Sequence, residues 1–329
     1  LQATITNYGA RVVSLLAPDR DGTLADVVLG FDDLDSYTQK PQYFGALVGR
    51  VANRIAGARV TINGTEYALT PDANGNHIHG GKRNFSRVVW SGAAERRGRE
   101  PRLRLSYTSA DGEEGYPGRL LVTVWYTLTG DNSLRIDYDA VSDKDTLVNL
   151  THHGFFNLGG DASGDVLGHR LRIAADAFLV VDRLRIPTGE IRPVAGTPFD
   201  FRELRALGER IDADDDQVGP AGGYDHCYAL RNQGGALAEA ALVVEPRSGR
   251  VMHVLTTEPG MQLYSGNNLN GSLIGKRGCA YQKRSGVCFE TQHYPDAPNH
   301  PHFPSILLRA GDHYRQTTVY RFSTQESVA

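Results

Sequence analysis

The sequence contains no run of about 18 apolar residues, the length that an α-helix needs to cross a bilayer, so we expect no membrane-spanning helix. It also has no excess of charge of one sign, because 35 Lys and Arg residues stand against 38 Asp and Glu residues. A near-neutral chain without a basic cluster is poorly suited to binding nucleic acid. We therefore expect neither a membrane nor a nucleic acid as a partner.

Cysteine is scarce, with only Cys227, Cys279 and Cys288 and no Cys-x-x-Cys spacing. This odd count argues against a disulfide scaffold and against a structural zinc site. Because free cysteines are usually buried and inert, we expect Cys227 and Cys288 to be small core residues. No secretory signal peptide is recognisable, so we expect a cytoplasmic location, or a periplasmic one if a leader was removed before Leu1.

Glycine and proline are plentiful, at 37 and 15 residues, whereas methionine occurs only twice. This composition is typical of a chain rich in turns and β-strands. Apolar and polar residues alternate over Leu103–Tyr107, Val122–Leu128 and Leu134–Ala140, which predicts strands with one buried face. The segments Ala240–Glu245 and Arg250–Thr256 flank a turn and predict a hairpin.

Signals for helices are few. The best one covers Asp200–Leu207, where Asp200 is placed to cap a helix, Glu203 has capping-box spacing and Gly208 is placed to end it. A second short helical turn is expected near Asp32–Tyr37.

The length of the chain alone suggests two domains, but all-β architectures often exceed about 200 residues as one domain. We therefore predict an all-β fold in which residues 1–329 form one large antiparallel β-sandwich domain with few short helices. A β-propeller is the competing β architecture, and it would need a repeating blade pattern that the sequence does not contain.

The segment most suggestive of chemistry is Gly286–Asn299. Within it, Val287–Phe289 predicts a short buried strand, and Glu290 follows directly. A carboxylate at the end of a buried strand is costly unless it is paired or used. Glu290 is therefore the first candidate for a catalytic residue.

Two further segments carry basic side chains. In Gly49–Ile55, Arg54 offers forked N–H donors that suit sugar hydroxyls, although an arginine in a structural turn explains the same residues. In Asn76–Gly81, His77 and His79 stand two residues apart, which in a strand places both rings on one face. A metal site would need further ligands at fixed spacing, and none follows; structural histidines are the other interpretation.

The segment Asn149–Leu158 contains the adjacent residues His152 and His153, which in a strand point to opposite faces. Histidine is the side chain best matched to proton transfer near neutral pH. Further along, Asp225 offers a two-oxygen acceptor to sugar hydroxyls, and Gln262 adds a polar group to an otherwise apolar strand. Each signal has an ordinary structural explanation alone, and their value lies in occurring together.

Taken together and in order, these segments resemble the aldose 1-epimerase family, from about Ile5 to Phe322. Connecting stretches such as Ile186–Glu190 and Thr197–Arg202 match as well. The resemblance implies one large β-sandwich, a supersandwich, with the site in an open cleft. It implies these roles: Glu290 as catalytic base, His153 as catalytic acid, His79 as a second active-site histidine, Arg54, Asp225 and Gln262 as substrate-binding residues, and Asn53 as a further contributor.

The resemblance also implies an isomerase that interconverts the α and β anomers of a neutral aldose, galactose or glucose, by acid–base ring opening, C1–C2 rotation and ring closure. Such an enzyme needs no cofactor and no metal, takes a monosaccharide as its small-molecule partner, and is a monomer or homodimer. Three alternatives remain: a pentose or hexose 6-phosphate as substrate, a glycoside hydrolase that uses Asp225 and Glu290, and a non-catalytic sugar-binding module.

One departure from the family pattern follows the proposed acid. Many relatives have a small hydroxyl residue and a tyrosine where this chain has Gly154 and Phe155. We align His153 with the acid of the family, and a register shifted by one residue would give that role to His152. The loss of two hydroxyls leaves the acid in place, but it affects the hydrogen bonding around the acid or the sugar preference.

Overall fold

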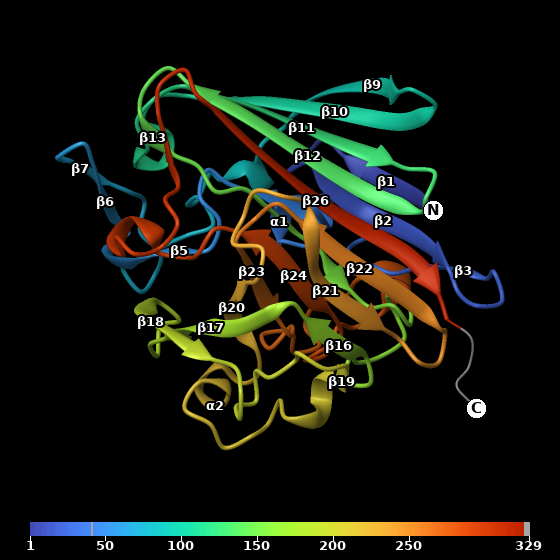
Figure 1. Ribbon diagram of the computed structural model, residues 1–329. Helices are drawn as coiled ribbons and strands as arrows, with labels where there is room; N and C mark the ends of the chain where they lie inside the picture. Colours follow the sequence, from blue (N-terminus) through green and yellow to red (C-terminus); the bar gives the residue numbers. More distant parts are fainter. Residues whose placement is uncertain (41, 326–329) are drawn as a thin grey trace.

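A nine-stranded antiparallel sheet forms one layer of the fold and runs diagonally through Figure 1. The computed structural model describes residues 1–40 and 42–325. In spatial order, the strands of this sheet are β19 (Arg205–Ala206), β16 (Arg170–Ile173), β21 (Ala238–Val244), β22 (Arg250–Thr256), β26 (His313–Thr324), β12 (Ser133–Ser142), β11 (Leu120–Leu128), β10 (Glu100–Ser109) and β9 (Ser91–Arg97).

A six-stranded antiparallel sheet forms the second layer. Its strands, in spatial order, are β15 (Phe155–Phe156), β24 (Val287–Gln292), β23 (Gly260–Tyr264), β20 (Asp225–Leu230), β17 (Ala175–Val181) and β18 (Pro187–Pro193). The smaller sheets pair β1 (Gln2–Thr6), β2 (Arg11–Pro18) and β3 (Leu24–Asp26); β4 (Ala46–Val48) with β14 (Thr151–His153); β5 (Arg54–Ile55) with β8 (His77–Ile78); β6 (Arg59–Ile62) with β7 (Thr65–Ala68); and β13 (Thr146–Leu147) with β25 (Leu307–Leu308).

Helical structure in the described residues is limited to short pieces. There are two α-helices, α1 (Leu34–Gln39) and α2 (Val218–Ala221). The 3-10 turns are Ala56–Ala58, Phe85–Arg87, Glu113–Gly115, Leu207–Glu209, Lys276–Gly278 and Ala297–Asn299. Within residues 1–40 and 42–325, no helix is both long enough and apolar enough to span a bilayer.

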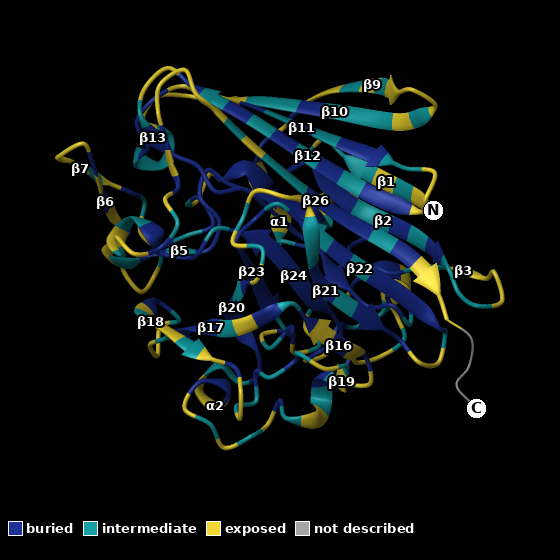
Figure 2. Ribbon diagram, in the orientation of Figure 1, coloured by how far each residue is buried: buried dark blue, intermediate teal, exposed yellow. Residues whose placement is uncertain are grey.

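The main hydrophobic core lies between the two large sheets. Side chains of β11 and β12 alternate between the two faces, so that Val122 and Leu134 are fully buried. Phe289 of β24 joins the same core from the other layer. Next to it, the hydroxyls of Thr291 on β24 and Thr318 on β26 lie 2.6 Å apart and tie the layers together. Figure 2 shows these facing strands as the dark, buried centre of the molecule.

The strands predicted from alternation are confirmed, because the three predicted segments lie within β10, β11 and β12. β21 and β22 form the expected hairpin, with Val244 opposite Val251. The two large sheets face each other across one core, so the predicted all-β sandwich with few short helices is confirmed as well. The helical turn expected near Asp32 is α1, which Asp33 caps by accepting the N–H of Ser36 at 2.7 Å.

The helix predicted over Asp200–Leu207 is wrong. This stretch is irregular, bends at Arg202 and Glu203, and leads into β19 at Arg205. The Asp200 carboxylate binds the side chain of Arg202 through two bonds of 2.9 and 2.8 Å instead of capping a helix. Phe199 and Phe201, two residues apart, are both buried in the main core, whereas an α-helix would place them on opposite sides. Core packing therefore overrides the capping signal.

All three cysteines are free thiols. Cys227 and Cys288 are buried, as predicted, whereas Cys279 is half-buried. Burial raises the pKa of the Cys288 thiol well above its ordinary value, so this thiol stays protonated at neutral pH.

His169 leads to a prediction about acid stability. Its Nε2 accepts the N–H of Leu158 at 2.9 Å, and burial lowers its pKa from 6.5 to about 4. As the pH falls below about 6.5 the unfolded chain binds a proton at this residue while the folded protein does not, so stability is lost down to about pH 4. We expect His169→Gln to reduce the loss of unfolding free energy on acidification by up to about 1.4 kcal/mol per pH unit.

Urea denaturation of wild type and His169→Gln, carried out at about pH 7 and at about pH 5, measures this difference in the free energy of unfolding. The comparison between the two proteins cancels the contributions of all other titrating groups. Equal losses of stability in the two proteins on acidification would contradict the prediction.

Candidate active site

Glu290 lies within β24, which runs two residues past the carboxylate. Val287 and Phe289 point into the main core, and Cys288 and Glu290 therefore point to the opposite face of the sheet. On the neighbouring strand β23, Gln262 stands directly opposite Glu290. Glu290 is only 2% exposed, so its carboxyl group lies at the floor of a pocket and not on an open surface.

The adjacent histidines of β14 point to opposite faces, as predicted. His152 turns into the core, where its Nδ1 lies 3.3 Å from the hydroxyl of Tyr320. His153 faces Glu290 instead, with Nε2 3.5 Å from Oε1. The histidine that reaches the carboxylate is therefore His153.

Aromatic neighbours fix the imidazole of His153. The ring of Tyr43 stacks on it with a centroid distance of 5.5 Å, and the ring of Phe155 stacks on it at 5.1 Å. The Sγ of Cys288 lies 3.6 Å from Nδ1. These contacts keep bulk water from the ring and orient its Nε2 toward Glu290.

Of the two histidines in the Asn76–Gly81 segment, only His79 reaches the pocket. His77 binds the carbonyl oxygen of Thr70 and the hydroxyl of Tyr116, each at 2.8 Å. The expectation that both rings share one face was wrong, because His79 has a left-handed backbone with φ of 50° and follows the end of β8. The N–H of Asn53 donates to Nδ1 of His79 at 3.2 Å, which leaves the ring hydrogen on Nε2.

Asp225, at the start of β20, forms a charged wall of the pocket. Its Oδ2 lies 3.6 Å from Nη2 of Arg54 and 3.5 Å from Nε of Arg185. Gln262 donates from Nε2 to Oδ1 at 2.8 Å. Asn53 accepts the backbone N–H and the Nη1 of Arg54 through its Oδ1. The carboxylate of Asp225 is therefore held from three sides.

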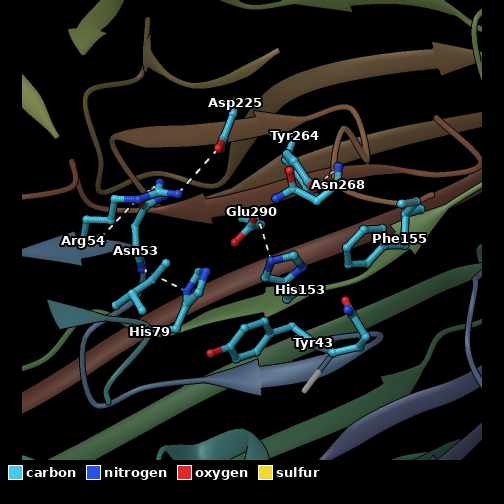
Figure 3. A pocket seen from close by; sticks show the side chains of 13 residues that line it. Tyr43, Asn53, Arg54, His79, His153, Phe155, Asp225, Tyr264, Asn268 and Glu290 are labelled. Atoms are coloured by element: carbon cyan, nitrogen blue, oxygen red, sulfur yellow. Dashed lines mark hydrogen bonds and ion pairs between the residues drawn. The ribbon is translucent and has the colours of Figure 1, made fainter. Parts of the chain in front are cut away.

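These groups converge in one pocket of about 230 Å³ (Figure 3). Its lining residues are Gln42, Tyr43, Asn53, Arg54, Ile78, His79, His153, Phe155, Asp225, Tyr264, Asn268, Leu269 and Glu290. Six of the seven predicted site residues are in this set. Gln262 is the exception, because it is 3% exposed and lies behind Asp225.

Comparison with known proteins gives the family. A profile of the aldose 1-epimerase family matches residues 1–321. The chain belongs to the aldose 1-epimerase family. Galactose mutarotase from Homo sapiens is 45% identical over 325 residues, which cover 98% of this chain and 91% of the relative. Aldose 1-epimerase from Escherichia coli K12 is 39% identical over 322 residues, which cover 97% and 91%.

Solved structures agree with this assignment. The crystal structure of an aldose epimerase homologue from C. elegans has a TM-score of 0.88 and 33% identity, covering 98% of this chain and 96% of the other. Galactose 1-epimerase from Lactobacillus acidophilus NCFM has a TM-score of 0.87 and 29% identity, covering 98% and 91%. The predicted enzyme class, an isomerase that interconverts aldose anomers, is confirmed, and so is the supersandwich fold of the family.

An aldose 1-epimerase works by proton transfer, so the protonation states of Glu290, His153 and His79 determine what the pocket can do. Burial raises the pKa of Glu290 well above its ordinary value; the charge of Asp225 adds to this effect and that of Arg54 opposes it. Burial also lowers the pKa of His153 to about 3 and the pKa of His79 well below 6.5. When Glu290 and His153 share one proton, the pocket by itself therefore favours a carboxylic acid beside a neutral imidazole.

Three side chains of this epimerase pocket have the composition of a metal-ligand set. His79, His153 and Glu290 each place a ligand atom within 4.8 Å of the others. A neutral imidazole binds a metal through a nitrogen that carries no hydrogen. Because Nδ1 of His79 accepts the N–H of Asn53, its Nε2 carries the hydrogen and is a donor. His79 therefore suits an oxygen atom of a sugar better than a cation.

The departure at Gly154 has a steric explanation. A Cβ atom at this position would lie 2.8 Å from Cε1 of His152 and 2.9 Å from a ring carbon of Phe156. Glycine therefore makes room for the buried ring of His152. Phe155, the second departure, lines the pocket and stacks on His153 without adding a hydroxyl group.

Sequence reasoning missed several residues of the site, among them Tyr43, Tyr264, Asn268 and Arg185. The first three line the pocket but belong to no motif that chemistry would single out. Arg185 directly precedes the matching stretch Ile186–Glu190, and its backbone is left-handed with φ of 64°. A cation at the end of a turn was the only signal available for it.

Arg185 leads to a prediction about substrate affinity. Its side chain is one-third exposed, and an ion pair in such a position is worth about 0.2–1 kcal/mol. We expect Arg185→Leu to raise KM for the sugar up to about five-fold, with kcat nearly unchanged, because Asp225 loses one of its three supports. Arg183→Leu, in the same turn but exposed, is the matched control. A wild-type KM in Arg185→Leu would show that this ion pair does not contribute.

Proposed function

We propose that this chain catalyses the mutarotation of a neutral aldohexose, galactose or glucose, with Glu290 as the base and His153 as the acid. The observation that carries this proposal is the approach of His153 Nε2 to within 3.5 Å of Glu290 Oε1 at the floor of a sugar-sized pocket. A carboxylate and an imidazole this close can act on two neighbouring oxygens of one substrate. In a pyranose those oxygens are the C1 hydroxyl and the ring oxygen O5.

Ring opening proceeds as follows. Glu290 removes the proton of the C1 hydroxyl, and the O–H electron pair forms the C=O bond of the aldehyde. The C1–O5 bond breaks, and its electron pair takes a proton from His153 at O5. Rotation about C1–C2 then presents the other face of the aldehyde, and the reverse transfers close the ring. The reaction needs no external oxidant or reductant, since it only moves protons and one C–O bond.

The protonation of the pair is restored after every cycle. Ring opening consumes carboxylate and imidazolium, and it produces carboxylic acid and neutral imidazole. Ring closure consumes that second form and regenerates the first. Burial favours the second form, and the distance of 3.5 Å between Nε2 and Oε1 supports exchange of the proton between the two forms.

The remaining pocket residues bind and orient the sugar. The Nε2–H of His79 is a donor suited to O5 or a neighbouring hydroxyl. The carboxylate of Asp225 and the guanidinium of Arg54 offer an acceptor and donors to hydroxyls on the other side of the ring. Asn53 supports this arrangement by holding Arg54 and His79, and Gln262 supports it from behind Asp225.

Polarimetry tests the proposal directly. Freshly dissolved α-D-glucose and α-D-galactose should reach their equilibrium rotations faster with the protein than in buffer, and the relative rates rank the two sugars. Acceleration only for arabinose or for a hexose 6-phosphate would replace the neutral hexose by that substrate. Sugar binding without acceleration would favour a binding module, and release of sugar from an aryl glycoside would favour a hydrolase.

Three broader expectations belong to the same proposal. The chain acts as a single domain, because both large sheets contribute to one core. It is a monomer or a homodimer, and its expected compartment is the cytoplasm. Analytical ultracentrifugation and fractionation of cells test the last two expectations.

A further inference from the structure

Gln292 shares a face of β24 with Glu290. Successive side chains of a strand point to opposite faces of the sheet, so Thr291 points to the other layer, where it binds Thr318. Cys288, two residues before Glu290 on the same face, contacts His153. Gln292, two residues after Glu290, therefore extends from the floor of the pocket into the protein, and it is 0% exposed.

The position opposite Gln292 on β23 is Gly260, which has no side chain to pair with it. The position opposite Glu290 is Gln262, whose Nε2 is already bound to Asp225. Two glutamine amides and the carboxyl group of Glu290 therefore occupy neighbouring positions of one sheet face. No side chain at position 260 separates them.

Several polar atoms of these three residues find no partner among the residues that the structure describes. They are Oε2 of Glu290, Oε1 of Gln262, and both Oε1 and Nε2 of Gln292. A buried polar group without a hydrogen bond is costly, and such groups in proteins are usually completed by an internal water. Neighbours on one face of a strand are about 6.6 Å apart, a spacing that one water can bridge.

We propose that Gln292 is a positioning residue for Glu290, acting through an internal water held between its side-chain amide and Oε2 of Glu290. The water donates to Oε2, and the amide of Gln292 and Oε1 of Gln262 complete its hydrogen bonds. Oε1 of Glu290 then stays directed at His153 and at the sugar. The functional part of this inference rests on the proposed role of Glu290 as the base.

A donor at Oε2 stabilises the carboxylate relative to the carboxylic acid, because it binds the charged form more strongly. It therefore favours the form of the pair that begins ring opening. The charged groups and histidines near Glu290 are Asp225 on β20, Arg54 on β5, His153 on β14 and His79 after β8. The other titratable groups near it are Tyr43, Tyr320, Cys227 and Cys288. The substitutions at Gln292 and Thr291 leave all of these groups in place.

The test compares Gln292→Met, which keeps the length of the side chain and removes its hydrogen bonds, with Thr291→Val. Thr291→Val is the matched control, because it removes a buried hydrogen bond from the other face of the same strand. We expect Gln292→Met to lower kcat/KM about ten-fold and to move the alkaline limb of its pH profile upward by about one unit, since the carboxylate loses a donor. Thr291→Val should lower the melting temperature and leave the pH profile unchanged.

A second readout does not depend on activity. The infrared C=O band of the Glu290 carboxylic acid, identified by its loss in Glu290→Gln, should shift to higher frequency in Gln292→Met. Glu290→Gln could stay active while the band still shifts in Gln292→Met. In that case Glu290 is not the base, but the water-mediated contact between Glu290 and Gln292 stands. A wild-type band and pH profile in Gln292→Met would overturn the inference and leave Gln292 a packing residue.

If Gln292→Met does not fold, the wild-type protein decides the question. A crystal structure at a resolution that shows ordered waters should contain one within hydrogen-bond distance of both Glu290 Oε2 and the Gln292 amide. A direct bond between the two side chains, or a site without water, would overturn the inference.

Discussion

Replacing Glu290 by glutamine lowers kcat by about 10²- to 10⁴-fold, which corresponds to about 3–5 kcal/mol in the activation barrier. The amide is nearly the same size as the carboxyl group, so the packing of β24 should be kept. It cannot accept the proton of the C1 hydroxyl, and ring opening then depends on water as the base. Polarimetry of α-D-galactose with wild type and variant at equal concentration measures the effect.

Two controls make this result interpretable. Thermal unfolding shows whether Glu290→Gln is folded, and isothermal titration with galactose shows whether the pocket still binds sugar. Because Glu290 is buried and disfavoured as an anion, the neutral glutamine should not lower the melting temperature greatly. A folded, sugar-binding Glu290→Gln with near-normal mutarotation would refute the assignment of the base.

The second large effect is expected at His153. His153→Gln removes the group that protonates O5, and we expect kcat to fall by about 10²- to 10⁴-fold in the same assay. Glu290 and His153 act on one proton circuit, so the double variant should be little slower than either single variant. Additive losses in the double variant would mean that the two side chains act independently.

His152→Gln is the matched control for this second prediction. His152 is adjacent in sequence, but its ring packs in the core against Tyr320. Its replacement should lower the melting temperature and leave kcat within a few-fold of wild type in the folded protein. Loss of mutarotation in His152→Gln together with normal activity in His153→Gln would reverse the assignment of the acid.

The pH dependence of kcat/KM in the wild type provides a further check on the same pair. Activity requires one proton shared between Glu290 and His153, so it should fall at low pH when both are protonated and at high pH when neither is. The two limbs belong to the pair and not to either residue alone. We expect Glu290→Gln and His153→Gln each to lose one of the two limbs of the pH profile.

Much of the site could be predicted from the sequence, because its motifs are local. Glu290 was recognisable as a carboxylate beside a buried strand, and His153 as one of two adjacent histidines of which only one can face a pocket. Arg54, Asp225 and His79 followed from segments that match a family. Gln262 was predicted with them as a sugar contact, and the sequence could not reveal its hydrogen bond to Asp225, which depends on the pairing of β20 with β23.

The sequence by itself determined the strands and their buried faces. Alternation over β10, β11 and β12 has a period of two residues, and this period is a property of the backbone that needs no distant partner. The same local rule determined that His152 and His153 diverge. Short-range patterns of this kind are predictable because the physical interaction they encode is itself short-range.

Only the tertiary structure decided which local signals prevail and which distant groups meet. The capping signal at Asp200 gave way because Phe199 and Phe201 both had to enter the core. Arg185, between β17 and β18 of the six-stranded sheet, and Arg54, on β5 of a separate two-stranded sheet, meet at Asp225 because the folded chain packs the two sheets side by side there. Burial beneath that pocket, and not residue type, moved the pKa values of Glu290 and His153 in opposite directions, because desolvation penalises whichever form is charged.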